Sequence, residues 1–147
     1  MTKVLFVCSG NTCRSPMAEA ILASKRLPGI EVRSAGVFAF DGADLSPQAG
    51  HVLADNQIDF QHKATLLQAE DVDWADLILT MTESHKTFIH QQFPHAADKV
   101  HTLKEYVGEE SKDVADPFGG SVSVYEETFA ELKQLIEKLI LTLNPNV

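Results

Sequence analysis

Residues 4–16 decide the fold and read Val-Leu-Phe-Val-Cys-Ser-Gly-Asn-Thr-Cys-Arg-Ser-Pro. Val4 to Val7 form a short, continuous apolar run, which is typical of a strand buried in a parallel sheet. A polar loop that contains glycine follows from Cys8 to Ser15, and Pro16 then opens a stretch with apolar residues at helical spacing. Proline fits the first turn of a helix, because its missing N–H has no partner there. The chain is therefore predicted to begin with a strand, a loop and a helix.

The same alternation continues along the rest of the chain. The expected elements are strands over 31–34, 76–81 and 99–103, and helices over 46–56, 83–92 and 121–143. Residues 104–120 are polar and rich in turn residues. This order predicts an α/β fold: a single three-layer domain over residues 1–147, with a four-stranded, mainly parallel sheet and helices on both faces. Ligands bind at the carboxyl ends of the strands in such sheets, which is where the loop after the first strand lies.

Composition narrows the class of protein. The chain has 147 residues, of which 44% are hydrophobic and 22% charged, as in an ordinary globular domain. Its net charge of −9 disfavours nucleic acids and anionic membranes as partners. The apolar run near the N-terminus is too short for a signal peptide, and no run reaches the roughly 20 residues of a membrane span. These features, and two cysteines that we expect to be free thiols, predict a cytoplasmic protein. A monomer is expected because no long apolar patch outside the predicted core requires a partner.

The loop from Cys8 to Ser15 has the chemistry of an anion site. Backbone N–H groups between a strand and a helix N-terminus form an anion-binding nest, and Gly10 and Asn11 can adopt the positive φ that a tight cradle requires. Arg14 can bind two oxygens of a tetrahedral anion. The helix N-terminus and Arg14 are expected to lower the pKa of Cys8, which makes it a nucleophile. As a lone residue Cys8 would be a small buried hydrophobe, but the pattern of cysteine, five residues, arginine and serine disfavours that reading.

These residues resemble a known family. The segment from Cys8 to Pro16 resembles the phosphate-binding loop of the low-molecular-weight protein tyrosine phosphatases, in which cysteine and arginine-serine are separated by five residues. Residues 116–120, Asp-Pro-Phe-Gly-Gly, look like the general-acid loop of that family. Residues 33–36 and the Ser46-Pro47 pair are similar to its intervening segments. The resemblance covers essentially the whole chain and implies a phosphatase that acts on phosphorylated proteins.

The resemblance also implies roles for individual residues. Cys8 would attack phosphorus and form a phosphocysteine, while Asp116 would protonate the leaving group and later activate water. By its position alone, Asp116 is a turn residue before a proline. Other residues would bind substrate or support the loop. Ser15 would donate to the Cys8 thiolate, Asn11 would hold the loop with support from Ser34, and the substrate-binding set would be Ser9, Gly10, Asn11, Thr12, Cys13, Ser15 and Phe118 together with the catalytic Arg14.

No metal or cofactor is expected. The six histidines show no ligand spacing with the cysteines, and His51, His85 and His90 are expected on helix faces. Cys13 has two readings. It can pack beneath the loop, or it can form a reversible disulfide with Cys8 that protects the nucleophile from irreversible oxidation; the resemblance favours the disulfide.

Thr12 bears on the choice of substrate. Many tyrosine-directed members of the family have a bulky aliphatic residue at this position, whereas threonine resembles the bacterial protein-arginine phosphatase branch. A smaller, polar wall admits a planar guanidino group, and the single aromatic Phe118 after Asp116-Pro117 can flank it by stacking. Phosphoarginine is therefore the expected substrate, with phosphotyrosine as the alternative.

Two other classes of protein remain as alternatives. An arsenate reductase uses the same scaffold, but this chain has no cysteine after Cys13 to build an intramolecular disulfide relay. A phosphoresidue-binding module without catalysis would need the anion nest and Arg14, but not Cys8, Ser15 and Asp116 together.

Overall fold

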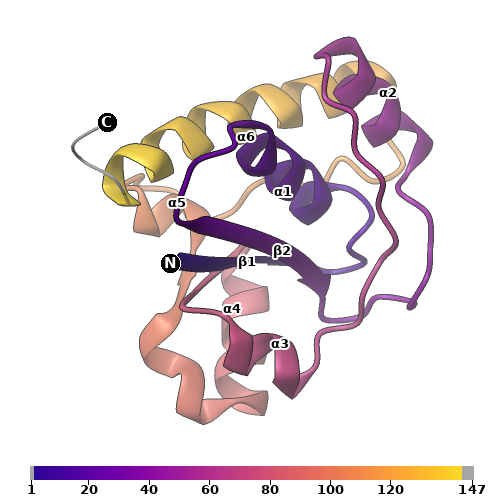
Figure 1. The fold of residues 1–147 in the computed structure, drawn as a ribbon. Helices are drawn as coiled ribbons and strands as arrows, with labels where there is room; N and C mark the ends of the chain where they lie inside the picture. The colour runs from indigo at the N-terminus through magenta and orange to yellow at the C-terminus, as the bar shows by residue number, and fades with distance from the viewer. Residues whose placement is uncertain (1, 144–147) are drawn as a thin grey trace.

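Strand β1 lies at the centre of a sheet of four parallel strands. The computed structural model describes residues 2–143. In it, β1 (Thr2–Cys8) lies between β2 (Ile30–Gly36) and β3 (Leu77–Thr80), and β4 (Val100–Thr102) pairs with β3. All three pairings are parallel. The predicted four-stranded parallel sheet is confirmed, and β1 ends at the loop that carries Cys8 (Figure 1).

Alternate residues of β1 supply two separate cores, which is why the central strand is apolar throughout. Val4 and Phe6 belong to the core beneath one set of helices, and Leu5 and Val7 belong to the core on the opposite face. The helices of the first face are α1 (Arg14–Ser24), α2 (Pro47–Asp55) and α6 (Val122–Leu143); those of the second are α3 (Ala69–Trp74) and α4 (Glu83–Gln92). Figure 1 shows the two groups on opposite sides of the sheet, which confirms the predicted three layers.

The longer predicted helices are confirmed, and three short ones were missed. The helices α2, α4 and α6 agree with the predictions to within a residue or two, and the Ser46 hydroxyl caps α2 by accepting from the N–H of Ala49 at 3.2 Å. The missed elements are α3, a 3-10 helix over Pro94–Lys99, and α5 (Leu103–Tyr106). They have four to six residues each and begin at local caps or a proline, so they are too short to show a periodic apolar pattern.

Two predicted boundaries were wrong. Helix α1 begins at Arg14 and not at Pro16, because the N–H of Met17 already bonds to the carbonyl of Cys13 at 3.1 Å. Proline is tolerated there because it still lies in the first turn. Strand β2 extends to Gly36, two residues beyond the prediction, because it continues in register with β1 as far as the pairing of Cys8 with Gly36.

Gly36 lies in close contact with the backbone of the loop after β1. The N–H groups of Val37 and Phe38 donate to the carbonyls of Cys8 and Ser9, both at 2.9 Å. A Cβ atom at position 36 would overlap the Ser9 carbonyl oxygen and lie 2.9 Å from the Asn11 nitrogen. Both of these atoms belong to the backbone of the loop. The loop could therefore make room for a side chain at position 36 only by changing its conformation.

Gly36→Ala is expected to destabilise the fold by about 1–3 kcal/mol, since the added methyl group overpacks a backbone contact. Gly50→Ala is the matched control. Gly50 lies within α2, where the nearest atom to an added Cβ is 3.8 Å away, and alanine there should add roughly 0.5–1 kcal/mol of stability. Urea unfolding of both variants measures the difference. Equal free energies of unfolding would contradict the close approach.

Candidate active site

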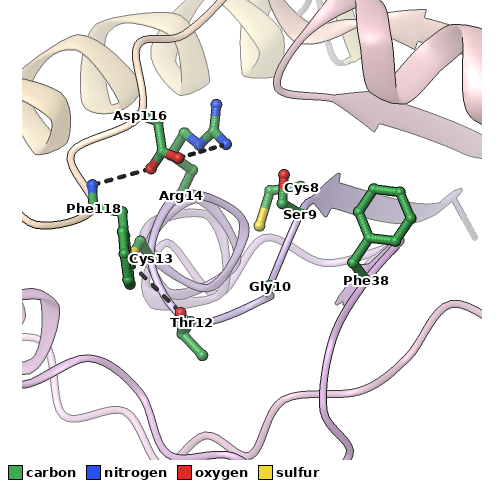
Figure 2. A pocket seen from close by; sticks show the side chains of 9 residues that line it. All are labelled: Cys8, Ser9, Gly10, Thr12, Cys13, Arg14, Phe38, Asp116 and Phe118. Carbon is green, nitrogen blue, oxygen red and sulfur yellow. Dashed lines mark hydrogen bonds and ion pairs between the residues drawn. The ribbon is translucent and has the colours of Figure 1, made fainter.

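The loop from Cys8 to Ser15 forms the floor of a pocket of about 290 Å³. Most of the lining residues come from this loop, and three come from distant segments: Phe38, Asp116 and Phe118. Figure 2 shows Asp116 and Phe118 on one side of the opening and Phe38 on the other. The pocket therefore brings together most of the predicted site residues, namely Cys8, Ser9, Gly10, Thr12, Cys13, Arg14, Asp116 and Phe118. Asn11, Ser15 and Ser34 are buried and do not line it.

Asn11 connects the loop to three parts of the protein. Its backbone has φ 56°, whereas Gly10 is not among the glycines with positive φ in the described residues. The Asn11 amide nitrogen donates to the hydroxyls of Ser15 at 2.9 Å and Ser34 at 3.0 Å, and its side-chain oxygen accepts from the N–H of Thr65 at 2.9 Å. Because this fully buried side chain is bonded at both ends, it fixes the loop in one conformation.

The same network orients a hydrogen bond to Cys8. Ser15 Oγ lies 2.8 Å from Cys8 Sγ. Since Ser15 already accepts a hydrogen bond from Asn11, its own hydroxyl proton is free to be donated to the sulfur. Ser15 is therefore placed to stabilise a thiolate when one forms and when it leaves.

The pKa of Cys8 is set by opposing influences. Burial is the largest and raises the pKa of Cys8 above its ordinary value, whereas hydrogen bonds from Ser15 and Asn11 and the charge of Arg14 lower it. The net direction is upward, so the sequence-based prediction of a lowered pKa was wrong. That prediction counted the helix N-terminus and Arg14 but not the burial of Cys8, which is 3% exposed. The Ser15 hydroxyl and Arg14 are the groups that make the thiolate accessible.

Arg14 joins the loop to the segment around Asp116. Its Nη1 donates to the carbonyl of Val114 at 2.9 Å, and its Nη2 lies 3.6 Å from the Asp116 carboxylate (Figure 2). The guanidinium is almost fully buried, while the Asp116 side chain is about half exposed (53%). The Asp116 carboxylate also accepts from the N–H of Phe118 at 3.0 Å. A cation, a carboxyl group and a thiol thus share one pocket, which is the set of groups that phosphoryl transfer to sulfur needs.

Three residues of this network were missed or misplaced by the sequence analysis. The Ser34 hydroxyl donates to Glu19 at 2.5 Å, and burial raises the pKa of Glu19. His62 Nε2 lies 2.7 Å from the Asn11 carbonyl oxygen. His85, which we expected on a helix face, is buried on α4 with its Nε2 2.9 Å from Ser9 Oγ. Only Glu19 left a signal in the sequence, as an acidic residue among the apolar residues of the first helix.

Cys13 lies on the pocket wall, against the first turn of α6. Its sulfur is 3.1 Å from the Tyr125 hydroxyl and 3.6 Å from Ser46 Oγ. Both cysteines are free thiols that line the same pocket. Cys13 therefore belongs both to the pocket lining and to the core between α1 and α6.

Residues 2–143 show neither a metal centre nor a helix that could span a membrane. In that range no three histidine, cysteine, aspartate or glutamate side chains gather in a way that could hold a metal ion. None of the described helices combines the length and apolar character needed to cross a membrane.

Comparison with known proteins identifies the family. The family described as low molecular weight phosphotyrosine protein phosphatase matches residues 3–147. The chain belongs to this family. The match is consistent with the geometry, because the paired loops of the resemblance meet at one pocket.

Relatives of this phosphatase are named either arginine phosphatases or tyrosine phosphatases. A protein-arginine-phosphatase of Geobacillus stearothermophilus is 50% identical over 137 residues, which cover 93% of each chain. The low molecular weight protein-tyrosine-phosphatase PtpB of Staphylococcus epidermidis is 41% identical over 137 residues, covering 93% of this chain and 96% of the relative. The solved structure of the YwlE arginine phosphatase with a phosphorylated active-site serine in place of cysteine has a TM-score of 0.94 at 43% identity, covering 99% of this chain and 97% of that one.

Ser15→Ala is expected to slow alkylation of Cys8 by iodoacetamide about tenfold or more at pH values below the pKa of the thiol. The variant loses a hydrogen bond that lowers the pKa of Cys8, so less thiolate is present at each pH. A hydrogen bond to a charged group contributes about 1.5–3 kcal/mol, which corresponds to a change of tenfold or more in the thiolate fraction. Peptide mapping by mass spectrometry separates Cys8 from Cys13. Ser24→Ala is the control, because that hydroxyl donates to Ile21 at the other end of α1. Identical pH–rate profiles for wild type and Ser15→Ala would refute this role.

Proposed function

We propose that this phosphatase removes phosphate from phosphoarginine in proteins. The observation that carries the proposal is Thr12 on the pocket wall, where a short polar side chain leaves room for a broad guanidino group. The names of the relatives support it, since the protein-arginine-phosphatase of Geobacillus is 50% identical and PtpB is 41% identical. We further propose that the protein acts in the cytoplasm as a monomer.

The first chemical step forms a phosphocysteine. Cys8 Sγ attacks phosphorus in line, and the S–P bond forms as the P–N bond to the guanidino group breaks. Asp116 transfers its proton to the leaving nitrogen, which makes the departing arginine a stable product. The loop N–H groups and Arg14 bind the three phosphoryl oxygens throughout. The YwlE structure supports a phosphocysteine at Cys8. In that enzyme, the serine that replaces the active-site cysteine carries a phosphate.

The second step returns the enzyme to its starting state. Asp116, now a carboxylate, takes a proton from a water molecule that attacks phosphorus, and the S–P bond breaks to release inorganic phosphate. The Ser15 hydroxyl donates a hydrogen bond to the departing Cys8 thiolate, with the two atoms already 2.8 Å apart. Asp116 suits both steps because its side chain is half exposed and therefore reachable by water.

Aromatic side chains favour a flat substrate group. Phe38 is 70% exposed and Phe118 is 78% exposed, and the two stand on opposite sides of the pocket. A guanidino group can stack on either ring while one of its N–H groups donates to the unprotonated oxygen of the Asp116 carboxyl group. The same rings would also accept a phenol, so phosphotyrosine is the second candidate substrate, in line with the name of the Staphylococcus relative.

Phosphate release from paired phosphoarginine and phosphotyrosine peptides tests this proposal. Wild type is expected to prefer phosphoarginine in kcat/KM, and Cys8→Ala is expected to lose both activities because the nucleophile is gone. Thr12→Ile should shift the preference toward phosphotyrosine by roughly tenfold or more, since the added apolar bulk narrows the wall.

Thr12→Val is the matched control for this experiment. It keeps the shape of threonine and removes only the hydroxyl, so it separates the effect of size from the effect of polarity. A wild-type preference for phosphotyrosine would show that the enzyme is a tyrosine phosphatase. An unchanged ratio in Thr12→Ile would show that Thr12 does not select the substrate.

We also propose that peroxide regulates the enzyme reversibly through Cys13. Peroxide oxidises the Cys8 thiolate to a sulfenic acid, and the Cys13 thiol displaces hydroxide from it to give a disulfide and water. The support is that both thiols line one pocket. A reducing thiol then restores both cysteines.

Cys13→Ser is expected to make inactivation by peroxide irreversible. Wild type treated with peroxide should recover most of its activity when dithiothreitol is added, whereas Cys13→Ser should stay inactive, because its sulfenic acid is oxidised further. Activity before and after dithiothreitol measures this, with untreated samples of both proteins as controls. Equal recovery of the two proteins would rule out a protective disulfide.

A further inference from the structure

His85 and Ser9 form a buried contact that the reaction as described does not use. His85 lies on α4 and is 5% exposed, and its Nε2 is 2.9 Å from Ser9 Oγ. Ser9 follows the nucleophile directly and lines the pocket. Among residues 2–143, the buried Nδ1 of His85 has no hydrogen-bond partner. The imidazole therefore has a single polar contact, and that contact is to a pocket residue.

The unpaired Nδ1 indicates which nitrogen carries the proton. A neutral imidazole has one N–H donor and one bare nitrogen acceptor. Burying an N–H without a partner is rarer in proteins than burying an acceptor without one. The favoured tautomer consequently keeps its proton on Nε2 and donates it to Ser9 Oγ.

The surroundings keep this imidazole neutral. Burial lowers the pKa of His85 to about 4, and the nearby positive charge of Arg14 acts in the same direction. The carboxylates of Asp113 and Asp116 act against this, but they do not restore the ordinary value. At neutral pH, His85 is thus a fixed, uncharged donor.

A hydroxyl that accepts from His85 has its own proton left to donate. Ser9 Oγ has His85 as its one hydrogen-bond partner among the described residues. We propose that His85 is a positioning residue that holds the Ser9 hydroxyl as an additional donor to a phosphoryl oxygen in the pocket. This inference rests on the proposed phosphatase site and adds a side-chain donor to its backbone N–H groups.

The affinity for inorganic phosphate tests this proposal without any turnover. Isothermal titration at pH 7 compares wild type with Ser9→Ala, His85→Leu and the double variant. Each single variant should bind phosphate about tenfold more weakly, because one hydrogen bond to a charged ligand is lost. The double variant should bind no more weakly than either single variant, since both substitutions remove the same bond.

Two further variants separate positioning from packing. His85→Gln can present an N–H near the position of Nε2 and should restore phosphate affinity to within about threefold of wild type. His90→Leu is the matched control, because His90 lies on the same helix and also has a buried nitrogen without a partner among residues 2–143. It should bind phosphate as wild type does.

Several results would overturn the proposal. These are unchanged affinity in Ser9→Ala, losses that multiply in the double variant, no rescue by His85→Gln, or an equal loss in His90→Leu. Unchanged affinity in Ser9→Ala overturns the proposal even where a His85 variant fails to fold. A preference for phosphotyrosine in the substrate assay would leave these expectations unchanged, whereas wild type that binds no phosphate would defeat both the proposed function and this inference.

Discussion

The shape of the loop after β1 depends on the buried amide of Asn11. Its two donor bonds and one acceptor bond join the loop to α1, β2 and the segment at Thr65, and they hold Asn11 in the left-handed region. The loop also contacts Gly36, where any side chain would overlap the backbone of the loop. This constraint keeps the Ser15 hydroxyl and the backbone N–H groups of Asn11 and Ser15 within reach of the Cys8 sulfur. A polar network this deeply buried is stable only because each member has its partners.

The reactivity of Cys8 results from competition between burial and polar contacts. Burial excludes water and raises the pKa of the thiol, while Ser15, Asn11 and Arg14 stabilise the thiolate. The same burial strengthens every electrostatic contact with a bound phosphoryl group, because fewer water molecules screen it. The site thus gives up some ease of ionisation and gains a stronger hold on a charged substrate.

The wall of the pocket is assembled from three parts of the chain. Thr12 comes from the loop, Phe38 from the segment after β2, and Asp116 with Phe118 from a distant loop tied to Arg14. The floor is therefore one continuous loop, whereas the wall combines residues of that loop with residues from two distant segments. The relatives include both a protein-arginine-phosphatase and a protein-tyrosine-phosphatase.

The sequence alone predicted the succession of the strands and the longer helices, the parallel sheet and the two loops that carry the chemistry. It could do so because apolar runs, helical spacing and the pattern from Cys8 to Pro16 are local signals. Only the tertiary structure decided the net pKa shift of Cys8, the contacts of Glu19 and His62, and the burial of His85 against Ser9. Each of these depends on which side chains from distant segments meet and how much water they exclude. Neither property leaves a periodic trace along the chain.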